Sequence, residues 1–320
     1  MYHTGARAFY EFCLECAPDL RFPLSDADCA LFYAWCTERV KPNTADNYRS
    51  HVAFIQELQL HIPRPVWSTL PFYSRVRKAR KLDMGGIRTR KHPITWTLAG
   101  AIVYTYDLDP RSSTQLTGII IFICILLTGV CGLFRLGELL VSSNKFHPER
   151  ILRHGQISFF ESAGGAPYAR VWLYRSKGDT YGDGVPVYIP AHVSDPRLCP
   201  VEWLKCVKRL TYNAALPNPD MAPLFIFPNG SLVKKRNFIR WLKGKLIGLG
   251  YDPKRYAGHS LRIGGAVSAQ RAGIPDHVIR TLGRWKSDAY LLYIKFSPKR
   301  VTNLRDHLQR LCTLQNPLGL

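Results

Sequence analysis

The stretch from residue 258 to residue 295 decides the fold. It reads Gly258-His259-Ser260-Leu261-Arg262, then Gly283-Arg284-Trp285, then Tyr290-Leu291-Leu292-Tyr293-Ile294-Lys295. His259 and Arg262 are three residues apart, so the spacing predicts that they share one face of a helix. A glycine-led tryptophan and a tyrosine follow downstream. One short segment therefore holds two donors suited to a phosphate and a candidate nucleophile.

The whole chain is strongly basic. Its 320 residues include 44 Lys and Arg against 23 Asp and Glu, which gives a formal net charge of +21. Such an excess attracts a polyanion over a long range. Nucleic acid is the first candidate partner and an anionic membrane is the second. The length is sufficient for two domains of ordinary size.

The membrane alternative depends on residues 116–134, which carry no charge. The stretch is long enough for a transmembrane helix, but it contains several glycines and threonines, and Arg135 follows it directly. Continuous apolar helices also occur at the centre of large domains. We therefore expect a buried core helix here and no membrane partner.

The cysteines indicate neither a disulfide framework nor a metal site. The chain has nine, an odd number, and only Cys13 and Cys16 form a Cys-x-x-Cys pair. A second pair at zinc-site spacing is missing from the sequence. We expect a reducing compartment, no metal and no cofactor.

The first part of the chain is predicted to be helical. Ser25 and Asp26 are suited to cap one helix, and Asn43 or Thr44 to cap the next. Prolines break the second helix, and a third is expected from about residue 67 to residue 81.

A basic cluster follows this helical part, around Gly85-Gly86. It consists of Arg75, Arg77, Lys78, Arg80, Lys81, Arg88, Arg90 and Lys91. This density favours contact with a phosphate backbone, although a solvated helix face with a nuclear-import signal fits as well. We expect a helical domain over residues 1–86, a basic linker over 87–92 and a second domain over 93–320.

The second part is predicted to be mainly helical with a short β region. Residues 157–160, 169–174 and 185–189 are rich in β-branched and aromatic side chains, and glycine-rich turns separate them. Residues 224–227 are a possible further strand. The expected fold class is mainly α with a small antiparallel β-sheet.

Exchange of a phosphodiester requires a small set of side chains. Negative charge builds on the non-bridging oxygens, and arginine binds two of them without losing its charge. A lysine can protonate the leaving oxygen, and a tyrosine can attack and hold the strand. Arg135 follows the apolar stretch, Glu138 comes one helical turn later, and Lys177 lies at the tip of a predicted hairpin.

The ordered set of motifs resembles the tyrosine recombinases of the phage-integrase superfamily. The matches, in chain order, are Arg135, Glu138, Lys177, His259, Arg262, Trp285 and Tyr293. They cover roughly residues 91–295, and the helical first part resembles the core-binding domain of that family. The resemblance implies a two-domain tyrosine-recombinase fold, with a helical core-binding domain and an α+β catalytic domain. Lys91-His92-Pro93-Ile94-Thr95 and Gly283-Arg284-Trp285 resemble the eukaryotic mobile-element branch, Crypton- or DIRS-like, which implies a nuclear location.

The resemblance also implies a role for each matched residue. Arg135 and Arg262 would hold the scissile phosphate, and Glu138 would hold Arg135 or Lys177 in place. Lys177 would give a proton to the leaving 5′ oxygen. Tyr293 would become linked to the 3′ phosphate.

His259 and Trp285 complete the matched set, and a second tyrosine lies close to Tyr293 in the sequence. His259 would assist proton transfer. Trp285 stands where a histidine is more usual in the family and would contact the phosphate through its indole N–H. Tyr290 is a rival nucleophile three residues before Tyr293, but it lacks the Tyr-Ile-Lys setting, so Tyr293 is the predicted nucleophile and Tyr290 the alternative.

The expected function is site-specific recombination or transposition of double-stranded DNA, without a metal. A homodimer on one site and a homotetramer in synapsis are implied by the resemblance. A predicted C-terminal helix carrying Val301, Leu304, Leu308 and Leu311 would pack on its own domain or on a neighbouring protomer. A type IB topoisomerase and a domesticated, non-cleaving DNA-binding protein are the alternatives.

Overall fold

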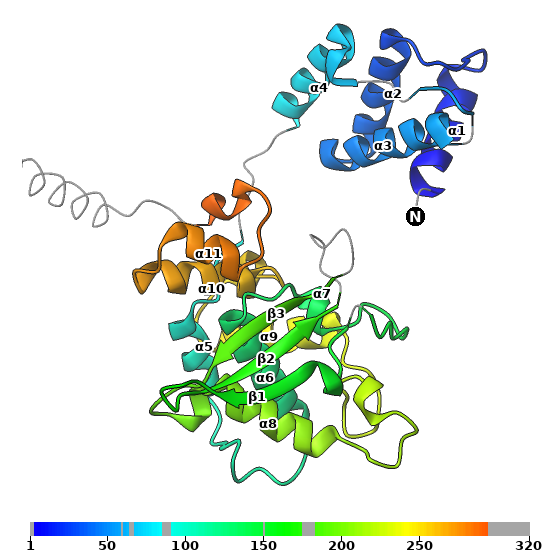
Figure 1. The fold of residues 1–320 in the computed structure, drawn as a ribbon. Helices are drawn as coiled ribbons and strands as arrows, with labels where there is room; N and C mark the ends of the chain where they lie inside the picture. The colour runs from blue at the N-terminus through cyan, green and yellow to red at the C-terminus, as the bar shows by residue number, and fades with distance from the viewer. Residues whose placement is uncertain are drawn as a thin grey trace, which may run out of the picture. The chain divides into compact units, whose positions relative to one another are not determined.

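The computed structural model describes residues 3–58, 60–63, 67–84, 91–149, 151–174 and 183–293 (Figure 1). The chain divides into two compact units, Met1–Thr89 and Arg90–Leu320. This division falls inside the predicted basic linker, residues 87–92.

The smaller unit is built from helices. They are α1 (His3–Cys16), α2 (Asp26–Arg39), α3 (Pro42–Leu58), the 3₁₀ turn η1 (Trp67–Thr69) and α4 (Pro71–Asp83). Ser25 caps α2 as predicted, and it forms a capping box with Asp28. The predicted cap of the next helix at Asn43 or Thr44 is wrong. The helix already begins at Pro42, whose fixed φ suits a first helical position.

The helix predicted from residue 67 is divided at Pro71. Proline has no N–H to donate, so α4 starts afresh with Pro71 in its first turn. Asp26 then secures this start, because its two carboxylate oxygens accept from the backbone N–H groups of Phe72 and Tyr73 at 2.8 Å and 2.7 Å. A carboxylate at a helix N-terminus satisfies free donors and opposes the helix dipole. Asp26 thereby joins α2 to α4.

Aromatic side chains fill the core of the smaller unit. Phe12, Phe32 and Tyr33 are almost fully buried. The ring of Tyr33 meets that of Tyr73 edge-on, with centroids 5.5 Å apart, an arrangement that suits the charge distribution of aromatic rings. A unit of this size is therefore stabilised by a few large apolar side chains.

The larger unit is mainly helical and contains one sheet. Its helices are α5 (Trp96–Val103), α6 (Gly118–Cys131), α7 (Leu136–Leu139), α8 (Pro200–Thr211), α9 (Lys235–Gly248), α10 (Ser260–Arg271) and α11 (Asp276–Leu282). Its 3₁₀ turns are η2 (His154–Gln156), η3 (Pro196–Leu198), η4 (Pro219–Met221), η5 (Pro253–Arg255) and η6 (Asp288–Leu292). Its strands are β1 (Ile157–Glu161), β2 (Pro167–Leu173) and β3 (Val185–Pro190).

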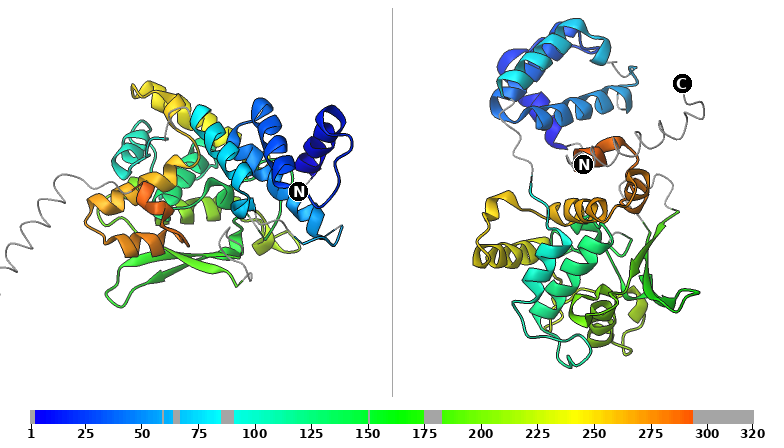
Figure 2. Two further views of the ribbon diagram at one scale, coloured as in Figure 1. Left: turned by 90° about the horizontal axis from the view of Figure 1, so that it is seen from above. Right: turned by 90° about the vertical axis from the view of Figure 1, so that its left-hand side faces the viewer.

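The three strands form an antiparallel sheet in the order β1-β2-β3. Val171 at its centre pairs with Ile157 on one side and with Val187 on the other. In both views of Figure 2 the strands, drawn in green, run along one edge of the larger unit. The predicted strands agree with these bounds to within two residues, and the predicted fold class is confirmed.

The possible strand at residues 224–227 is wrong. Only an isolated bridge between Ile226 and Leu232 forms there. The turn at Asn229-Gly230 brings these two residues together at once, and Gly230 has a positive φ of 76°. The N–H of Leu224 donates instead to the carbonyl of Leu152 at 3.0 Å, so the backbone bonds of this segment go to different neighbours and no continuous ladder forms.

The apolar stretch forms α6, and it is a buried core helix as predicted. Its residues 120–121 and 123–130 are buried in the main hydrophobic core. Throughout the segments that the structure describes, we find no helix with the length and apolar character needed to cross a bilayer.

Helix α10 packs unusually close to its neighbours because it contains Gly264 and Gly265. A Cβ at Gly264 would lie 1.7 Å from the carbonyl oxygen of Ile94, and a Cβ at Gly265 would lie 2.2 Å from that of Val130. The backbone N–H of Ile94 also donates to the carbonyl of Ser260 at 2.9 Å. These contacts place the start of α10 beside the end of α6.

Candidate active site

The candidate site lies where the end of α6, the short helix α7 and the start of α10 meet. Arg135 precedes α7, and Glu138 lies within it. The guanidinium of Arg135 donates from Nη1 to Glu138 Oε1 at 2.8 Å, and its backbone N–H donates to Oε2 at 2.9 Å. Glu138 is almost fully buried, whereas the side chain of Arg135 keeps 30% of its surface exposed. The carboxylate therefore fixes an arginine that is still accessible from outside.

Arg262 lies in the first turn of α10 and is fully buried. It donates from Nη1 to the carbonyl of Leu133 at 2.8 Å and from Nη2 to the carbonyl of Gly283. Burial, followed by the positive charges of Arg135 and Arg284, lowers the pKa of Arg262 to about 9. The group is still charged at neutral pH, so the site keeps a fixed positive charge in a region of low dielectric.

Trp285 covers Arg262 with the face of its ring. The guanidinium carbon of Arg262 lies 4.3 Å from the ring centroid, a cation–π contact that strengthens when water is excluded. A Cβ at Gly283 would lie 1.6 Å from a ring carbon of Trp285, so only glycine admits the ring in this position. Arg262 therefore occupies this face of the Trp285 ring.

The hydroxyl of Tyr293 is hydrogen-bonded to Nε2 of His259 at 2.8 Å. His259 is the N-cap of α10 with helical backbone angles, and its carbonyl accepts from the N–H of Ile263, so it lies one turn before Arg262 as the spacing predicts. Burial and the charges of Arg262 and Arg135 lower the pKa of His259. The imidazole is therefore neutral at neutral pH, and with its proton on Nδ1 it accepts from the tyrosine hydroxyl.

The two rival tyrosines have different surroundings. Tyr290 is 7% exposed and packs in a small apolar cluster with Leu133, Ala266 and Ile279. Tyr293 is half-buried. Both tyrosine rings lie 6.1 Å from that of Trp285, so this contact does not separate them. Only the hydroxyl of Tyr293 lies against His259 among the residues described here. The geometry favours Tyr293 as the reactive hydroxyl.

The comparisons with known proteins give structural matches alone. No protein-family description and no curated protein matches the sequence. The structure is similar to a XerH site-specific recombinase bound to a palindromic difH substrate, with a TM-score of 0.60 and 13% identity over 97% of this chain and 78% of that one. It is also similar to the Tn1549 transposon integrase in complex with transposon right end DNA, with a TM-score of 0.57 and 12% identity over 97% and 93%. A lambda integrase dimer bound to a COC′ core site matches with a TM-score of 0.53 and 15% identity over 92% and 87%.

The chain has the tyrosine-recombinase fold. Within it, the structure places six of the seven predicted site residues next to one another, from Arg135 and Glu138 through His259 and Arg262 to Trp285 and Tyr293. The seventh, Lys177, lies outside the described residues. So do the residues of the predicted C-terminal helix.

The site also contains two cations to which the sequence gave no role, Arg284 and Lys235. Arg284 donates from Nη2 to Glu138 Oε2 at 3.1 Å, although the sequence gave it no separate role. Lys235 lies beside α7, since a Cβ at Gly137 would lie 2.9 Å from its Nζ. Neither position is marked by spacing along the chain, because each depends on how distant elements pack.

The basic cluster between residues 75 and 91 divides into paired and free cations. Arg77 and Lys81 donate to Asp46 of α3 at 2.8 Å and 2.6 Å, and Arg80 donates to Glu38. Arg75 and Lys78 are exposed, and they have no carboxylate partner in the described part of the smaller unit. Lys91 donates to the carbonyl of Lys254, while Arg88 and Arg90 lie outside the described residues.

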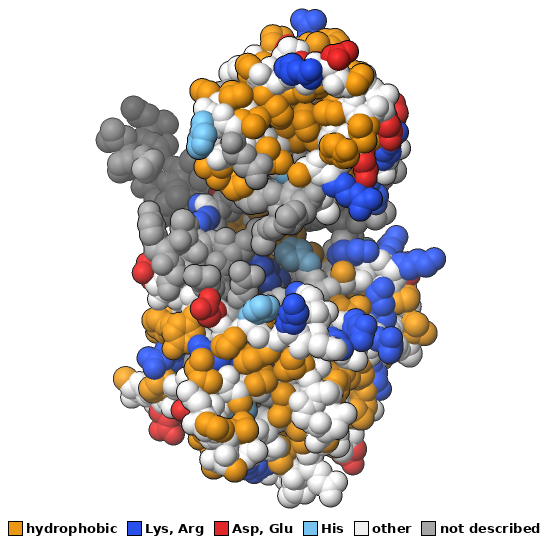
Figure 3. Space-filling view, turned by 90° about the vertical axis from the view of Figure 1, so that its right-hand side faces the viewer, with side chains coloured by type: hydrophobic (Ala, Val, Ile, Leu, Met, Phe, Trp, Pro, Cys, Tyr) orange, Lys and Arg blue, Asp and Glu red, His pale blue; other side chains and the backbone are white. Residues whose placement is uncertain are grey.

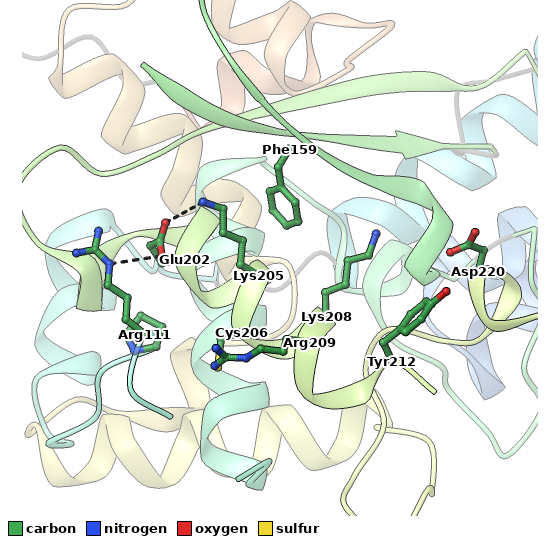
Figure 4. Close-up of a pocket in the computed structure, with 10 residues that line it drawn as sticks. Arg111, Phe159, Glu202, Lys205, Cys206, Lys208, Arg209, Tyr212 and Asp220 are labelled. Atoms are coloured by element: carbon green, nitrogen blue, oxygen red, sulfur yellow. Dashed lines mark hydrogen bonds and ion pairs between the residues drawn. The ribbon is translucent and has the colours of Figure 1, made fainter. Parts of the chain in front are cut away.

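A separate pocket of about 800 Å³ lies between α8 and β1 and contains none of the predicted site residues (Figure 4). Glu202 pairs there with Lys205 at 3.2 Å and with Arg111 at 3.5 Å. Lys208 donates to two backbone carbonyls. Because these cations already have partners, the pocket is a poor candidate for phosphate. In the described segments, no three His, Cys, Asp or Glu side chains gather in a way that suits a metal ion.

Proposed function

We propose that this protein is a site-specific tyrosine recombinase that cuts and rejoins duplex DNA through a covalent link to Tyr293. The hydrogen bond between Tyr293 and the neutral His259 carries the proposal. It places a nucleophile and a proton acceptor together, beside the fixed charges of Arg262 and Arg135. The tyrosine-recombinase fold supports the same conclusion.

The proposed reaction is an exchange of one phosphodiester for another. The Tyr293 oxygen attacks the phosphorus while its proton passes to Nε2 of His259. The P–O5′ bond breaks, and the 3′ phosphate stays on the tyrosine. Arg135 and Arg262 stabilise the negative charge that develops on the non-bridging oxygens. Attack by a 5′ hydroxyl then reverses these steps, so the bond energy is conserved and rejoining needs no external energy source.

The leaving 5′ oxygen requires a proton, and we assign its delivery to Lys177. The resemblance in sequence supports this role. Glu138 acts indirectly, by fixing Arg135 through two hydrogen bonds. Trp285 acts by covering Arg262, and contact of its indole N–H with the phosphate is part of the proposal.

The assembly and the biological setting are part of this proposal too. The lambda integrase in the comparison is a dimer on its core site, and we propose a homodimer on one site and a homotetramer in synapsis for this chain. Lys91-His92-Pro93-Ile94-Thr95 and Gly283-Arg284-Trp285 favour a Crypton- or DIRS-like transposing element that acts in the nucleus.

The test is covalent capture of DNA by matched tyrosine variants. The natural chain should form a denaturant-resistant adduct on duplex DNA carrying the ends of its own element. Tyr293→Phe should abolish the adduct and leave DNA binding unchanged, because only the nucleophilic oxygen is lost. Tyr290→Phe, which removes a hydroxyl from the apolar cluster, should still form the adduct.

Three outcomes would redirect the assignment. An adduct from Tyr293→Phe would move the nucleophile elsewhere. Relaxation of a supercoiled plasmid that lacks the site would indicate a type IB topoisomerase. Tight binding without an adduct from the natural chain on any element end would indicate a non-cleaving DNA-binding protein.

A further inference from the structure

Arg284 has a backbone conformation that is unusual for its residue type. Its φ is +57°, in the left-handed region, which residues with a Cβ rarely adopt. The position follows the C-cap Gly283 of α11. The N–H of Arg284 donates to Thr281, and the N–H of Trp285 donates to Arg280. This is a Schellman turn in which arginine occupies the place that glycine usually takes.

Helix α6 ends in a turn of the same kind. Its C-cap is Gly132, and Leu133 follows with a φ of +49°. The N–H of Leu133 donates to Val130, and the N–H of Phe134 donates to Gly129. In both turns, the last carbonyls that the turn itself does not use remain available to donors from other elements.

Two guanidinium groups join these turns. Arg284 donates to the carbonyl of Gly132 at 3.1 Å and to that of Leu133 at 3.2 Å. Arg262 donates to the same Leu133 carbonyl and to the carbonyl of Gly283. The backbone of each turn is thus bound by an arginine from another element, and the two arginines share one acceptor.

Arg284 also competes for the carboxylate that holds Arg135. Its Nη2 takes Oε2 of Glu138 at 3.1 Å, and both side chains are at most 8% exposed. Arg135 reaches the other oxygen, Oε1, with a single guanidinium nitrogen. Oε2 also accepts from the backbone N–H of Arg135 at 2.9 Å. Loss of Arg284 would leave one lone pair of Oε2 free to take a second guanidinium N–H of Arg135, which would close a two-bond fork.

We propose that Arg284 is a positioning residue that sets the geometry of both phosphate-binding arginines. It does so by occupying Glu138 Oε2 and by sharing the Leu133 carbonyl with Arg262. Through the first contact it keeps the remaining N–H groups of Arg135 available to an anion. Through the second it fixes the turn against which Arg262 is aligned. The inference rests on the proposed function, because it assigns a purpose to that same site.

The test uses two variants of Arg284 and a matched control at another position. Arg284→Met removes the guanidinium, Arg284→Lys keeps the charge without the fork, and Arg271→Met removes a charge from the exposed end of α10. We expect Arg284→Met to slow adduct formation about 100-fold, with DNA affinity within about threefold of Arg271→Met. Arg284→Lys should recover part of the rate, which a role limited to folding would not predict.

A double-mutant cycle tests the route through Glu138. In a Glu138→Gln background, Arg284→Met should slow the reaction by no more than about threefold further, because the shared oxygen is already altered. Fully additive losses would overturn this route. Natural adduct rates in both Arg284→Met and Arg284→Lys would overturn the whole proposal.

A second measurement separates this inference from the proposed function. Inorganic phosphate, titrated into the free protein and followed by ³¹P NMR, reports the state of the arginines without any cleavage. We expect Arg284→Met to weaken phosphate binding about tenfold and Arg271→Met to leave it unchanged. A natural chain that forms no adduct yet shows this difference would refute the recombinase proposal alone. Equal phosphate affinity in the two variants would refute the positioning role.

Discussion

At the scale of single residues, the site is defined by charge and burial. Three guanidinium groups surround one carboxylate, which leaves the site with excess positive charge before any ligand is bound. That charge acts on His259 as well as on a phosphate. It disfavours the imidazolium and so keeps the ring ready to accept a proton.

The pH dependence of adduct formation follows from His259. Its pKa lies below the ordinary 6.5 because of burial and the charges of Arg262 and Arg135. The rate should therefore stay high as pH falls through about 6.5 and should decline only when the ring finally charges. Single-turnover rates on duplex DNA between about pH 5 and about pH 8 measure this. A rate that is halved at or above the ordinary pKa would contradict it.

The same shift affects stability. The folded protein takes up the His259 proton at a lower pH than the unfolded chain does. The free energy of unfolding should therefore fall as pH drops below about 6.5. A His259→Gln variant should lose this contribution, which urea unfolding at several pH values would measure.

At the scale of elements, the close packing of α10 decides whether the site exists. Helix α10 carries Arg262, and its glycines allow it to contact the backbone at Ile94 and at Val130. Glycine in a helix costs about 0.5–1 kcal/mol relative to alanine. Here the missing Cβ is required, because it allows Gly264 and Gly265 to lie against the backbone of another segment.

A pair of glycine substitutions tests this packing. Gly264→Ala places a Cβ 1.7 Å from the Ile94 carbonyl oxygen, so we expect a loss of about 2–4 kcal/mol in unfolding free energy. Gly244→Ala in α9 meets no atom within 4 Å and should gain about 0.5–1 kcal/mol. Urea denaturation of the two variants gives both values. Equal stability would show that the start of α10 is free to move away from Ile94.

At the scale of the whole molecule, the net charge of +21 is spread unevenly. Lys and Arg side chains gather along one edge of the larger unit (Figure 3). In the smaller unit, the cations of α4 divide into those bound to Asp46 or Glu38 and the exposed pair Arg75 and Lys78. Free cations release counterions from DNA when they bind, whereas paired ones do so less.

The salt dependence of DNA binding should distinguish these two groups. Replacing both Arg75 and Lys78 with Gln should reduce the slope of log K against log salt by about 1.8, or about 0.9 per lost phosphate contact. Replacing Arg77 and Lys81 should change the slope less. It should instead destabilise the smaller unit, because Asp46 is left largely buried without a partner. Fluorescence anisotropy with a labelled duplex measures the slopes, and equal slopes for both pairs would contradict the division.

The sequence by itself determined the local structure of this protein and the residues that compose its site. β-Branched and aromatic residues between glycine-rich turns located the three strands, and a continuous apolar stretch located the buried helix α6, because both signals lie in consecutive residues. The ordered motifs selected Arg135, His259, Arg262 and Tyr293 before any contact was known.

Only the tertiary structure decided which side chains meet. It placed Tyr293 on His259 and Tyr290 in an apolar cluster, though both tyrosines stand in the same short segment. It gave Arg284 a partner in Glu138, 146 residues away. Contacts of this kind depend on the packing angles of several elements and on two left-handed turns, and no local pattern encodes them.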